Sequence, residues 1–315
     1  MSHARTPRAA GVIGVAIVCA VLAQAPTFAQ EMEPKAYSAS PIGANFLVTS
    51  YTWSTGSVVS DPTLPVSDVR AGVHGLVVGL GHTFNAFGNL GLATAAMPYV
   101  LADVTGKVFE QRTAITRSGL ADARFKMSVN LRGNPAMSPR EFAAARRRTI
   151  VGASLTVTAP AGQYYDSKLI NIGTNRWSFK PEVGVSFPTG RWDLDAYVGG
   201  WFYTANSRFY PGGSLRTQDP VLSVQGHASY SVRRGLWIAA DGTWYRGGSV
   251  RIDNGDASTS MNNSRVGVTA SFPVGRRYSA KVAYASGIVA RTGTDFSVVA
   301  AAFQMVWLST RWSGR

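Results

Sequence analysis

The sequence predicts an all-β fold: an antiparallel transmembrane β-barrel of the outer-membrane type, with about twelve strands. Three observations lead to this prediction: strict alternation of apolar and polar residues, long runs of that alternation, and an N-terminus with the form of a secretory signal. Globular strands usually span about 5–6 residues, whereas a tilted crossing of a bilayer needs about 9–11. The long runs therefore favour a membrane barrel over a soluble sandwich.

The alternation is clearest in residues 177–203, where side chains of opposite character follow one another with a period of two. Successive side chains of a strand leave opposite faces, so one face here is apolar and the other carries charges. The first run ends at residues 188–191 (PTGR), which are typical of a tight hairpin turn, and the pattern then restarts. The apolar face consists of Trp177, Phe179, Pro181, Val183, Val185 and Phe187, then Trp192, Leu194, Ala196, Val198, Gly200 and Phe202.

Residues 1–29 have the form of a secretory signal peptide. Two arginines precede an apolar run over residues 9–23, and a small-residue cleavage site at residues 27–29 places the mature start at Gln30. Cys19 is the only cysteine, and its loss with the signal excludes a disulfide framework or a Cys-ligated metal from the mature chain. No later apolar stretch approaches 18 residues, so no transmembrane helix is expected.

After the signal, residues 30–42 are expected to form a periplasmic N-terminal segment and residues 43–312 the barrel. An even strand number agrees with a barrel whose chain ends both lie in the periplasm. Short turns are then expected on the periplasmic side and long loops outside, for example over residues 105–118. The twelve expected strands cover residues 43–56, 69–85, 88–103, 119–132, 147–159, 174–188, 191–205, 218–232, 235–247, 263–273, 277–291 and 296–309.

The connection between the fourth and fifth strands contains a helix signal. Residues 138–141 (SPRE) have the capping-box pattern, with Pro at the first helical position. Phe142 and the alanines after it favour a short helix over residues 139–147. A surface helix at the periplasmic mouth is the simpler interpretation, and a docking site for a partner is the alternative.

The formal net charge is +14, and it falls to +12 when the two signal arginines are removed. Such a charge is typical of nucleic-acid-binding proteins, but these basic residues are scattered among turns and strand ends. We therefore expect no nucleic acid partner, no metal and no cofactor. The expected location is the outer membrane of a Gram-negative bacterium. The expected partners are outer-membrane lipid, lipopolysaccharide, the barrel assembly machinery and a small hydrophobic solute.

Three segments carry a family resemblance: residues 119–131 (GLADARFKMSVNL), residues 149–203 and residues 233–248 (RRGLWIAADGTWYRGG). With them the chain resembles the phenol-degradation meta-pathway family of outer-membrane proteins, whose members are often labelled transporters. The resemblance covers most of the mature chain, and residues 149–203 are its specific part. It implies a barrel that handles aromatic or other hydrophobic compounds, and it brings no established catalytic residues.

The charged face of the alternation is assigned to the lumen. Charges of mixed sign in a low-dielectric interior are expected to pair, because an unpaired buried charge costs far more free energy than a paired one. The lining is then either a salt-bridged filling of the lumen or a narrow polar path whose charges select what passes. The assigned residues are Arg124, Lys126, Lys180, Glu182, Asp193, Asp195, His227, Ser229, Asp241, Arg265 and Lys281.

The predicted function is a channel or transporter for passive passage of small hydrophobic or aromatic compounds, and not an enzyme. Tyr164, Tyr165 and Asp166 lie in an expected outward loop, where they would contact substrate or pack the loop. Two alternatives remain open. One is an outer-membrane lipid hydrolase that uses His227 and Ser229, which share a strand face. The other is a structural or adhesive barrel without transport.

Overall fold

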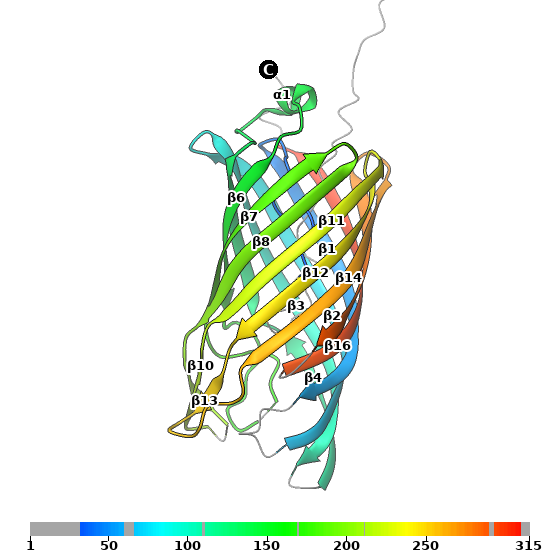
Figure 1. Ribbon diagram of the computed structural model, residues 1–315. Coiled ribbons are helices and arrows are strands. Elements are labelled where there is room, and N and C mark those ends of the chain that lie inside the picture. The colour runs from blue at the N-terminus through cyan, green and yellow to red at the C-terminus, as the bar shows by residue number, and fades with distance from the viewer. Residues whose placement is uncertain are drawn as a thin grey trace, which may run out of the picture.

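The computed structural model describes residues 32–59, 66–108, 111–168, 170–210, 212–289 and 293–309. The predicted signal peptide lies outside these residues. The described chain forms a closed antiparallel barrel, with a short helix at one end and a small second sheet at the other (Figure 1). This confirms the predicted fold class.

The barrel closes because the strand order returns to its start. In order around the ring, the strands are β4 (Gln111–Leu120), β3 (Asn89–Val108), β5 (Ala123–Arg132), β6 (Ile150–Ala159), β7 (Ser178–Thr189), β8 (Trp192–Tyr203), β11 (Val221–Arg233), β12 (Leu236–Gly247), β14 (Met261–Val274), β15 (Tyr278–Val289), β16 (Gly293–Leu308), β1 (Ala44–Val59) and β2 (Val66–Ala86). The pairing of β2 with β3 closes the ring. Since β4 and β5 share one wall, β8 lies opposite β1, six walls away in either direction.

The shared wall is interrupted at Ala121 and Asp122. β3 pairs with both β4 and β5, and counting these two as one wall gives the predicted total of twelve. The carboxylate of Asp122 explains the interruption, because it accepts the backbone amides of Gly162 and Thr174, each at 2.9 Å. At this point the wall is therefore tied to the loop between β6 and β7, and β4 beyond it pairs with β3.

The predicted long loop over residues 105–118 is wrong. β3 continues to Val108 and β4 begins at Gln111, so the two form a hairpin that projects beyond the rest of the barrel (Figure 1). The prediction failed because apolar alternation weakens outside the bilayer, whereas strand pairing continues to satisfy the backbone hydrogen bonds. The connections between β8 and β11 and between β12 and β14 were also expected to lack strands. Together they form one three-stranded sheet of β9 (Asn206–Phe209), β10 (Ser214–Gln218) and β13 (Val250–Ile252).

The two ends of the barrel differ, and we name them the long-loop end and the short-turn end. The long-loop end carries the β3–β4 hairpin and the three-stranded sheet, and the short-turn end carries tight turns and α1 (Pro139–Ala144). α1 begins with a complete capping box, in which Glu141 accepts the Ser138 amide at 2.7 Å. This bond holds the pKa of the Glu141 carboxyl below its usual value. Within the described residues, no helix is both long and apolar enough to span a membrane.

The helix predicted to residue 147 is shorter than expected. It stops at Ala144, because Ala145 adopts an extended backbone with ψ 142°. Arg147 then turns toward the barrel, where its guanidinium donates to the carbonyl of Gly190 at 3.3 Å. Side-chain bonding to the rim therefore replaces the last predicted helical turn.

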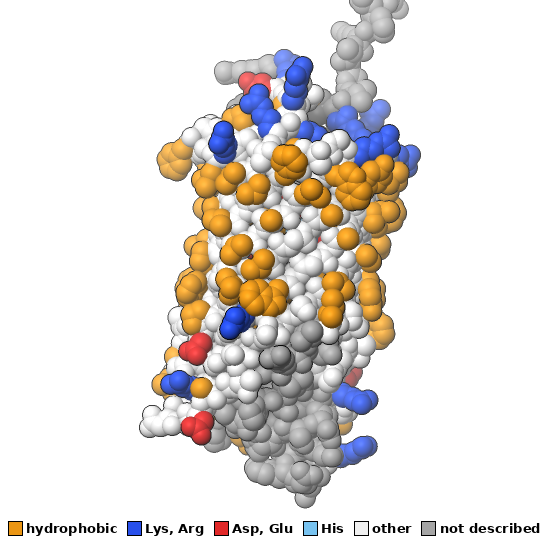
Figure 2. All heavy atoms as spheres, viewed as in Figure 1, with side chains coloured by type: hydrophobic (Ala, Val, Ile, Leu, Met, Phe, Trp, Pro, Cys, Tyr) orange, Lys and Arg blue, Asp and Glu red, His pale blue; other side chains and the backbone are white. Residues whose placement is uncertain are grey.

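The outer face of the barrel is apolar and the inner face is polar, which is the inverse of a soluble barrel. On β7, Val183 is 57% exposed, whereas Lys180 and Glu182 are 2% and 4% exposed. Apolar side chains cover the wall between the two ends, and Lys and Arg gather at the short-turn end (Figure 2). This distribution is that of a wall that faces lipid.

Candidate functional site: the interior of the barrel

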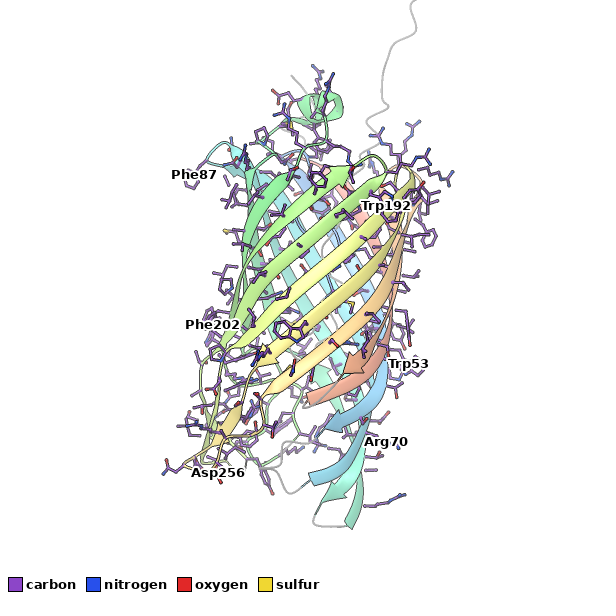
Figure 3. The ribbon with its side chains drawn as sticks, in the orientation of Figure 1. Trp53, Arg70, Phe87, Trp192, Phe202 and Asp256 are labelled. Carbon is purple, nitrogen blue, oxygen red and sulfur yellow. The ribbon has the colours of Figure 1, made fainter. Side chains whose placement is uncertain are left out.

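Aromatic side chains on the outer wall mark the limits of the interior. Trp192 lies near the short-turn end, and Phe202 and Trp53 lie toward the long-loop end (Figure 3). These three side chains are 45%, 47% and 46% exposed, respectively. Aromatic girdles of this kind lie at the two membrane–water interfaces of outer-membrane barrels. The interior between them is the region through which a solute would pass.

Residues 32–43, which we name the plug, lie inside the barrel. This corrects the prediction of a periplasmic segment over residues 30–42. The plug bonds with walls on several sides: Glu33 with β11, Lys35 and Ala36 with β8, and Tyr37 with β6 and β7. The wall side chains that make these bonds, such as Asp195, Ser154 and Gln225, are buried on the inner face, so the segment that contacts them lies within the ring.

Tyr37 anchors the plug, and its side chain is 1% exposed. Its hydroxyl lies 3.1 Å from Ser154 Oγ and donates to the carbonyl oxygen of Glu182 at 3.4 Å. Its ring packs edge-on against Tyr197, with 5.3 Å between the ring centroids. Gly184 leaves room for this ring, since a Cβ there would come within 2.6 Å of it.

Ion pairs also hold the plug to the wall. Lys35 pairs with Asp193, and its backbone amide donates to Asp195 at 3.2 Å. Glu33 pairs with Lys126 on β5. Removing one partner of a buried pair leaves the other uncompensated, which costs much more than an exposed pair contributes. These pairs therefore favour the seated plug over a released one.

The wall carries its own pairs of opposite charge. Lys180 Nζ lies 2.7 Å from Glu182 Oε2, and Gln225 donates to the same oxygen at 3.1 Å. Near the short-turn end, Lys281 Nζ lies 5.7 Å from the ring centroid of Trp237. The Arg265 guanidinium donates to the Phe296 carbonyl at 2.6 Å. Together with the plug contacts, these contacts involve seven of the eleven predicted lumen residues: Lys126, Lys180, Glu182, Asp193, Asp195, Arg265 and Lys281.

His227 and Ser229, the pair considered for hydrolysis, do not form a catalytic arrangement. His227 Nδ1 lies 2.7 Å from Asp241 Oδ1, its partner in the β11–β12 register, and Thr269 donates to Asp241 Oδ2 at 2.7 Å. Among the described residues, neither His227 Nε2 nor Ser229 Oγ has a hydrogen-bond partner, so the two side chains are not bonded to each other. A nucleophile needs its base within hydrogen-bond reach.

In the long-loop half of the interior, the predicted lumen cations Arg124 and Lys180 lie beside aromatic rings that were not predicted there, and Arg176 is a further cation that was not predicted. The ring centroid of Trp201 lies 5.6 Å from the Arg124 guanidinium and 5.8 Å from Lys180 Nζ. The Arg176 guanidinium lies 4.3 Å from the ring centroid of Tyr203. The alternation that turns Asp193 and Asp195 inward also turns Trp201 and Tyr203 inward, so the signal was present in the sequence. We name this group the cation–aromatic wall; its members are Arg124, Arg176, Lys180, Trp201, Tyr203 and Tyr245.

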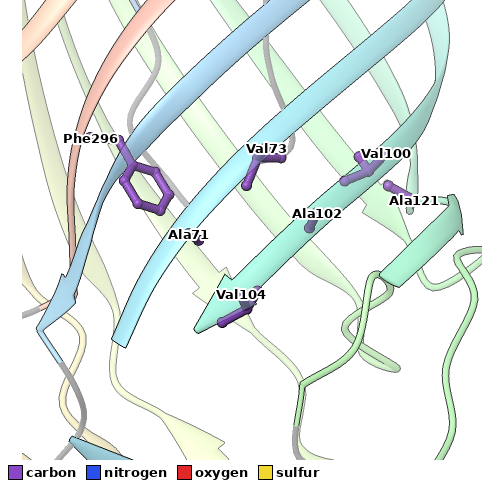
Figure 4. Close-up of a cluster of buried hydrophobic side chains, with 7 residues drawn as sticks. All are labelled: Ala71, Val73, Val100, Ala102, Val104, Ala121 and Phe296. Carbon is purple, nitrogen blue, oxygen red and sulfur yellow. The ribbon is translucent and has the colours of Figure 1, made fainter. Parts of the chain in front are cut away.

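An apolar wall lines the other side of the same half of the interior. It comes from the buried faces of β2 and β16, which flank β1 and lie across the ring from β8, and from β3 and Ala121, which follow β2 around the ring (Figure 4). Ile170 and Ile172, from the loop between β6 and β7, pack against it. The buried members of this apolar wall are Ala71, Val73, Val100, Ala102, Val104, Ala121 and Phe296.

The residues predicted for outward-loop substrate contact are used in part to pack that loop. The Tyr164 hydroxyl donates to the carbonyl of Arg208 at 2.9 Å and accepts from Asn206 at 2.9 Å. The Tyr165 ring centroid lies 4.4 Å from Lys168 Nζ, while Asp166 approaches Gly212. In the described part of the chain, no group of three His, Cys, Asp or Glu residues could hold a metal ion.

Comparisons with known proteins agree with this architecture. A family model described as "Putative MetA-pathway of phenol degradation" matches residues 54–294. No curated protein matches the chain.

Among solved structures, an outer membrane channel from Pseudomonas putida F1 is similar, with a TM-score of 0.74 and 20% identity over 88% of this chain and 100% of that chain. The Pseudomonas putida toluene transporter TodX has a TM-score of 0.45 and 8% identity over 85% of this chain and 90% of that chain. The second likeness is too distant in shape to support an argument. The first shows the same barrel fold, and because the family model spans more than half of the sequence, the chain belongs to the phenol-degradation MetA-pathway family.

Proposed function

We propose that the protein is an outer-membrane channel for passive passage of small hydrophobic or aromatic compounds. The observation that carries the proposal is the inverted barrel, which joins an apolar outer face to an interior lined by paired charges and aromatic rings. A barrel with this inversion is soluble in lipid and offers a polar route through it. The family description supports aromatic compounds as the solute class.

On this proposal, a solute enters at the long-loop end and meets the cation–aromatic wall and the apolar wall first. The plug then stands across its route toward the short-turn end, held by Tyr37 and by ion pairs. Passage requires either a gap beside the plug or a movement of the plug. The charges along the route would select among solutes through their desolvation cost.

The surroundings of the barrel belong to the same proposal. The protein would lie in the outer membrane of a Gram-negative bacterium, inserted by the barrel assembly machinery. Exposed arginines near the long-loop end, such as Arg70 on the outer wall (Figure 3), would pair with lipopolysaccharide phosphates. We propose no nucleic acid partner, since an exported barrel presents its basic residues to lipid headgroups and solvent.

The geometry favours neither alternative function. A lipid hydrolase would need a bonded nucleophile and base at a face open to lipid, whereas His227 and Ser229 are buried in the interior and are not bonded to each other. A purely structural barrel would not need a buried donor such as Arg176 Nη1, which has no hydrogen-bond partner in the described part of the chain. We therefore propose that the protein is not an enzyme and that it conducts.

Single-channel recording of the purified barrel in planar bilayers tests the proposal. Discrete conductance steps, together with release of benzyl alcohol from liposomes that contain the barrel, are the expected result. A barrel that produces neither would be structural or adhesive. Release of fatty acid from phospholipid by the same preparation, abolished by Ser229→Ala, would instead establish a hydrolase.

A further inference from the structure

We propose that the cation–aromatic wall is a binding site for an aromatic carboxylate, such as a benzoate-like monoanion. The inference rests on the proposed channel function and names a class of solute within it. The carboxylate would bind Arg176 and the indole N–H of Trp201, and the ring would lie between the aromatic side chains and the apolar wall. A neutral aromatic compound of the same size would form no ion pair with Arg176.

Two buried donors of this wall have unused hydrogen-bonding capacity. Arg176 is 4% exposed and donates from Nη2 to Gln218 at 2.5 Å, but its Nη1 has no hydrogen-bond partner in the described structure. Trp201 is also 4% exposed, and its Nε1 likewise has no partner there. Buried donors are normally satisfied, because leaving one without an acceptor destabilises the protein. Both groups would gain from an acceptor supplied by a ligand.

Nearby carboxylates do not fill this role. Asp122 is engaged by the amides of Gly162 and Thr174 and by the Thr174 hydroxyl at 2.6 Å. Glu182 is paired with Lys180. Among the described residues, no carboxylate lies within ion-pair distance of Arg176. The acidic side chains Asp193, Asp195 and Asp241 lie on the strand halves nearer the short-turn end.

The surfaces around these donors suit a flat apolar ring. Trp201, Val221 and Tyr245 form a buried cluster with Tyr203 packed against it. Phe296 on β16 and Ala71 and Val73 on β2 lie across the ring from β8. One side of the lumen is thus cationic and aromatic and the other apolar, which matches a solute with a charged group at one edge of an aromatic ring.

The chemistry favours a carboxylate over other polar groups. A guanidinium offers parallel donors in the fork geometry of a carboxylate, and bonds between charged partners are about twice as strong as neutral ones. In a buried site these bonds replace the hydration that an anion loses on leaving water. The aromatic rings then favour benzoate over acetate through stacking and apolar burial.

The test is benzoate binding to the full-length purified barrel, measured by calorimetry and by quenching of tryptophan fluorescence, beside acetate and benzyl alcohol. Benzoate is expected to bind more tightly than both. Arg176→Gln and Trp201→Phe should each weaken benzoate binding by about tenfold and weaken benzyl alcohol binding by much less, because the alcohol has no charge for the guanidinium to pair with. Trp201→Phe removes an N–H that has no partner in the described structure, so it breaks no hydrogen bond there and should fold. It therefore tests the site even if Arg176→Gln fails to fold. Arg234→Gln, at an exposed short turn, is the matched charge control and should bind as the parent does.

The outcomes separate this inference from the channel proposal. Equal binding of benzoate and benzyl alcohol, or benzoate binding insensitive to both substitutions, overturns the anion site. Equal binding of acetate and benzoate shows a general anion site and overturns the aromatic part. A barrel that releases benzyl alcohol from liposomes but shows any of these results is still a channel. A barrel that binds benzoate as expected but conducts no solute supports the benzoate-binding site and contradicts the channel function.

Discussion

Val183 shows at the scale of one residue what the outer wall requires. It stands near the middle of β7 and is 57% exposed to what we infer is lipid. Val183→Arg should lower the free energy of unfolding by about 2–4 kcal/mol, because a charge at the bilayer midplane is poorly solvated. Thr189→Arg, at the short-turn end of the same strand, should cost about 0–1 kcal/mol. Equal costs in a lipid-vesicle refolding titration would contradict the lipid-facing assignment.

The His227–Asp241 pair offers a second single-residue test. Asp241→Ala removes the acceptor of both His227 and Thr269, and each buried donor left unsatisfied costs roughly 1–3 kcal/mol. We expect the free energy of unfolding to fall by about 2–4 kcal/mol, measured by the same titration. Ser229→Ala is the control, since Ser229 Oγ has no partner to lose. A large cost at Ser229, or lost phospholipid hydrolysis in either variant, would contradict a purely structural pair.

At the scale of the element, α1 depends on its capping box. Ser138→Ala removes the side chain that accepts the Glu141 amide and should destabilise the helix by about 1 kcal/mol. The loss should be local, because α1 stands outside the barrel. Hydrogen exchange at the Phe142 amide, which bonds to Ser138, should accelerate, while exchange in β7 should not change. Faster exchange in both elements would show that α1 supports the barrel itself.

The same box predicts a dependence on pH. The pKa of Glu141 is lower in the folded helix than in the unfolded chain, so the carboxylate stabilises α1 at pH values above the ordinary glutamate pKa of about 4.3. That contribution is lost as the pH falls through the lowered pKa. Fraying of α1 on acidification, absent in Glu141→Gln, is the expected result by amide exchange. A helix that is equally stable on both sides of this window would contradict the role of the carboxylate.

Elements also show what the sequence could and could not predict. The faces of β7 and β8 followed from alternation alone, because each lipid-facing apolar residue is flanked by inward neighbours. The β3–β4 hairpin was missed, since its side chains outside the bilayer lack a distinct apolar face. The cation–aromatic wall was missed because Arg176 precedes β7 and its neighbours come from separate strands.

At the scale of the whole molecule, the position of the plug inside the barrel could not be predicted from sequence patterns. It has no periodicity, and its partners lie far along the chain: Lys35 and Asp195 are 160 residues apart, and Glu33 and Gln225 are 192. Only the closed ring brings these side chains together. A short irregular segment next to a predicted signal peptide therefore looked like a free tail.

Tyr37→Ala tests whether the plug limits passage. The substitution removes a buried ring and the hydroxyl contacts with Ser154 and Glu182, so the plug should leave its seat more often. Single-channel conductance should rise, while the barrel should keep its folded mobility in unheated gels. Ser38→Ala is the matched control, since Ser38 is only half-buried. Unchanged conductance in Tyr37→Ala would mean that solutes pass beside the plug.

The position of the plug also fixes an order of events during assembly. The last residue of the plug, Gly43, is hydrogen-bonded to the strands on either side of β1. Its amide donates to the Thr83 carbonyl at 2.8 Å, and its carbonyl accepts from the Ser309 amide at 2.9 Å. The first and last strands of the barrel, β1 and β16, pair with each other from Ala44 and Leu308 to Val59 and Gly293. The seat for Tyr37 exists only after β6, β7 and β8 have paired, and a contact between such distant segments forms late because it must first overcome the entropy of closing a long loop. The first described residues of the chain are therefore among the last to reach their native place. While the barrel strands are still unpaired, the plug is not seated and does not block the interior.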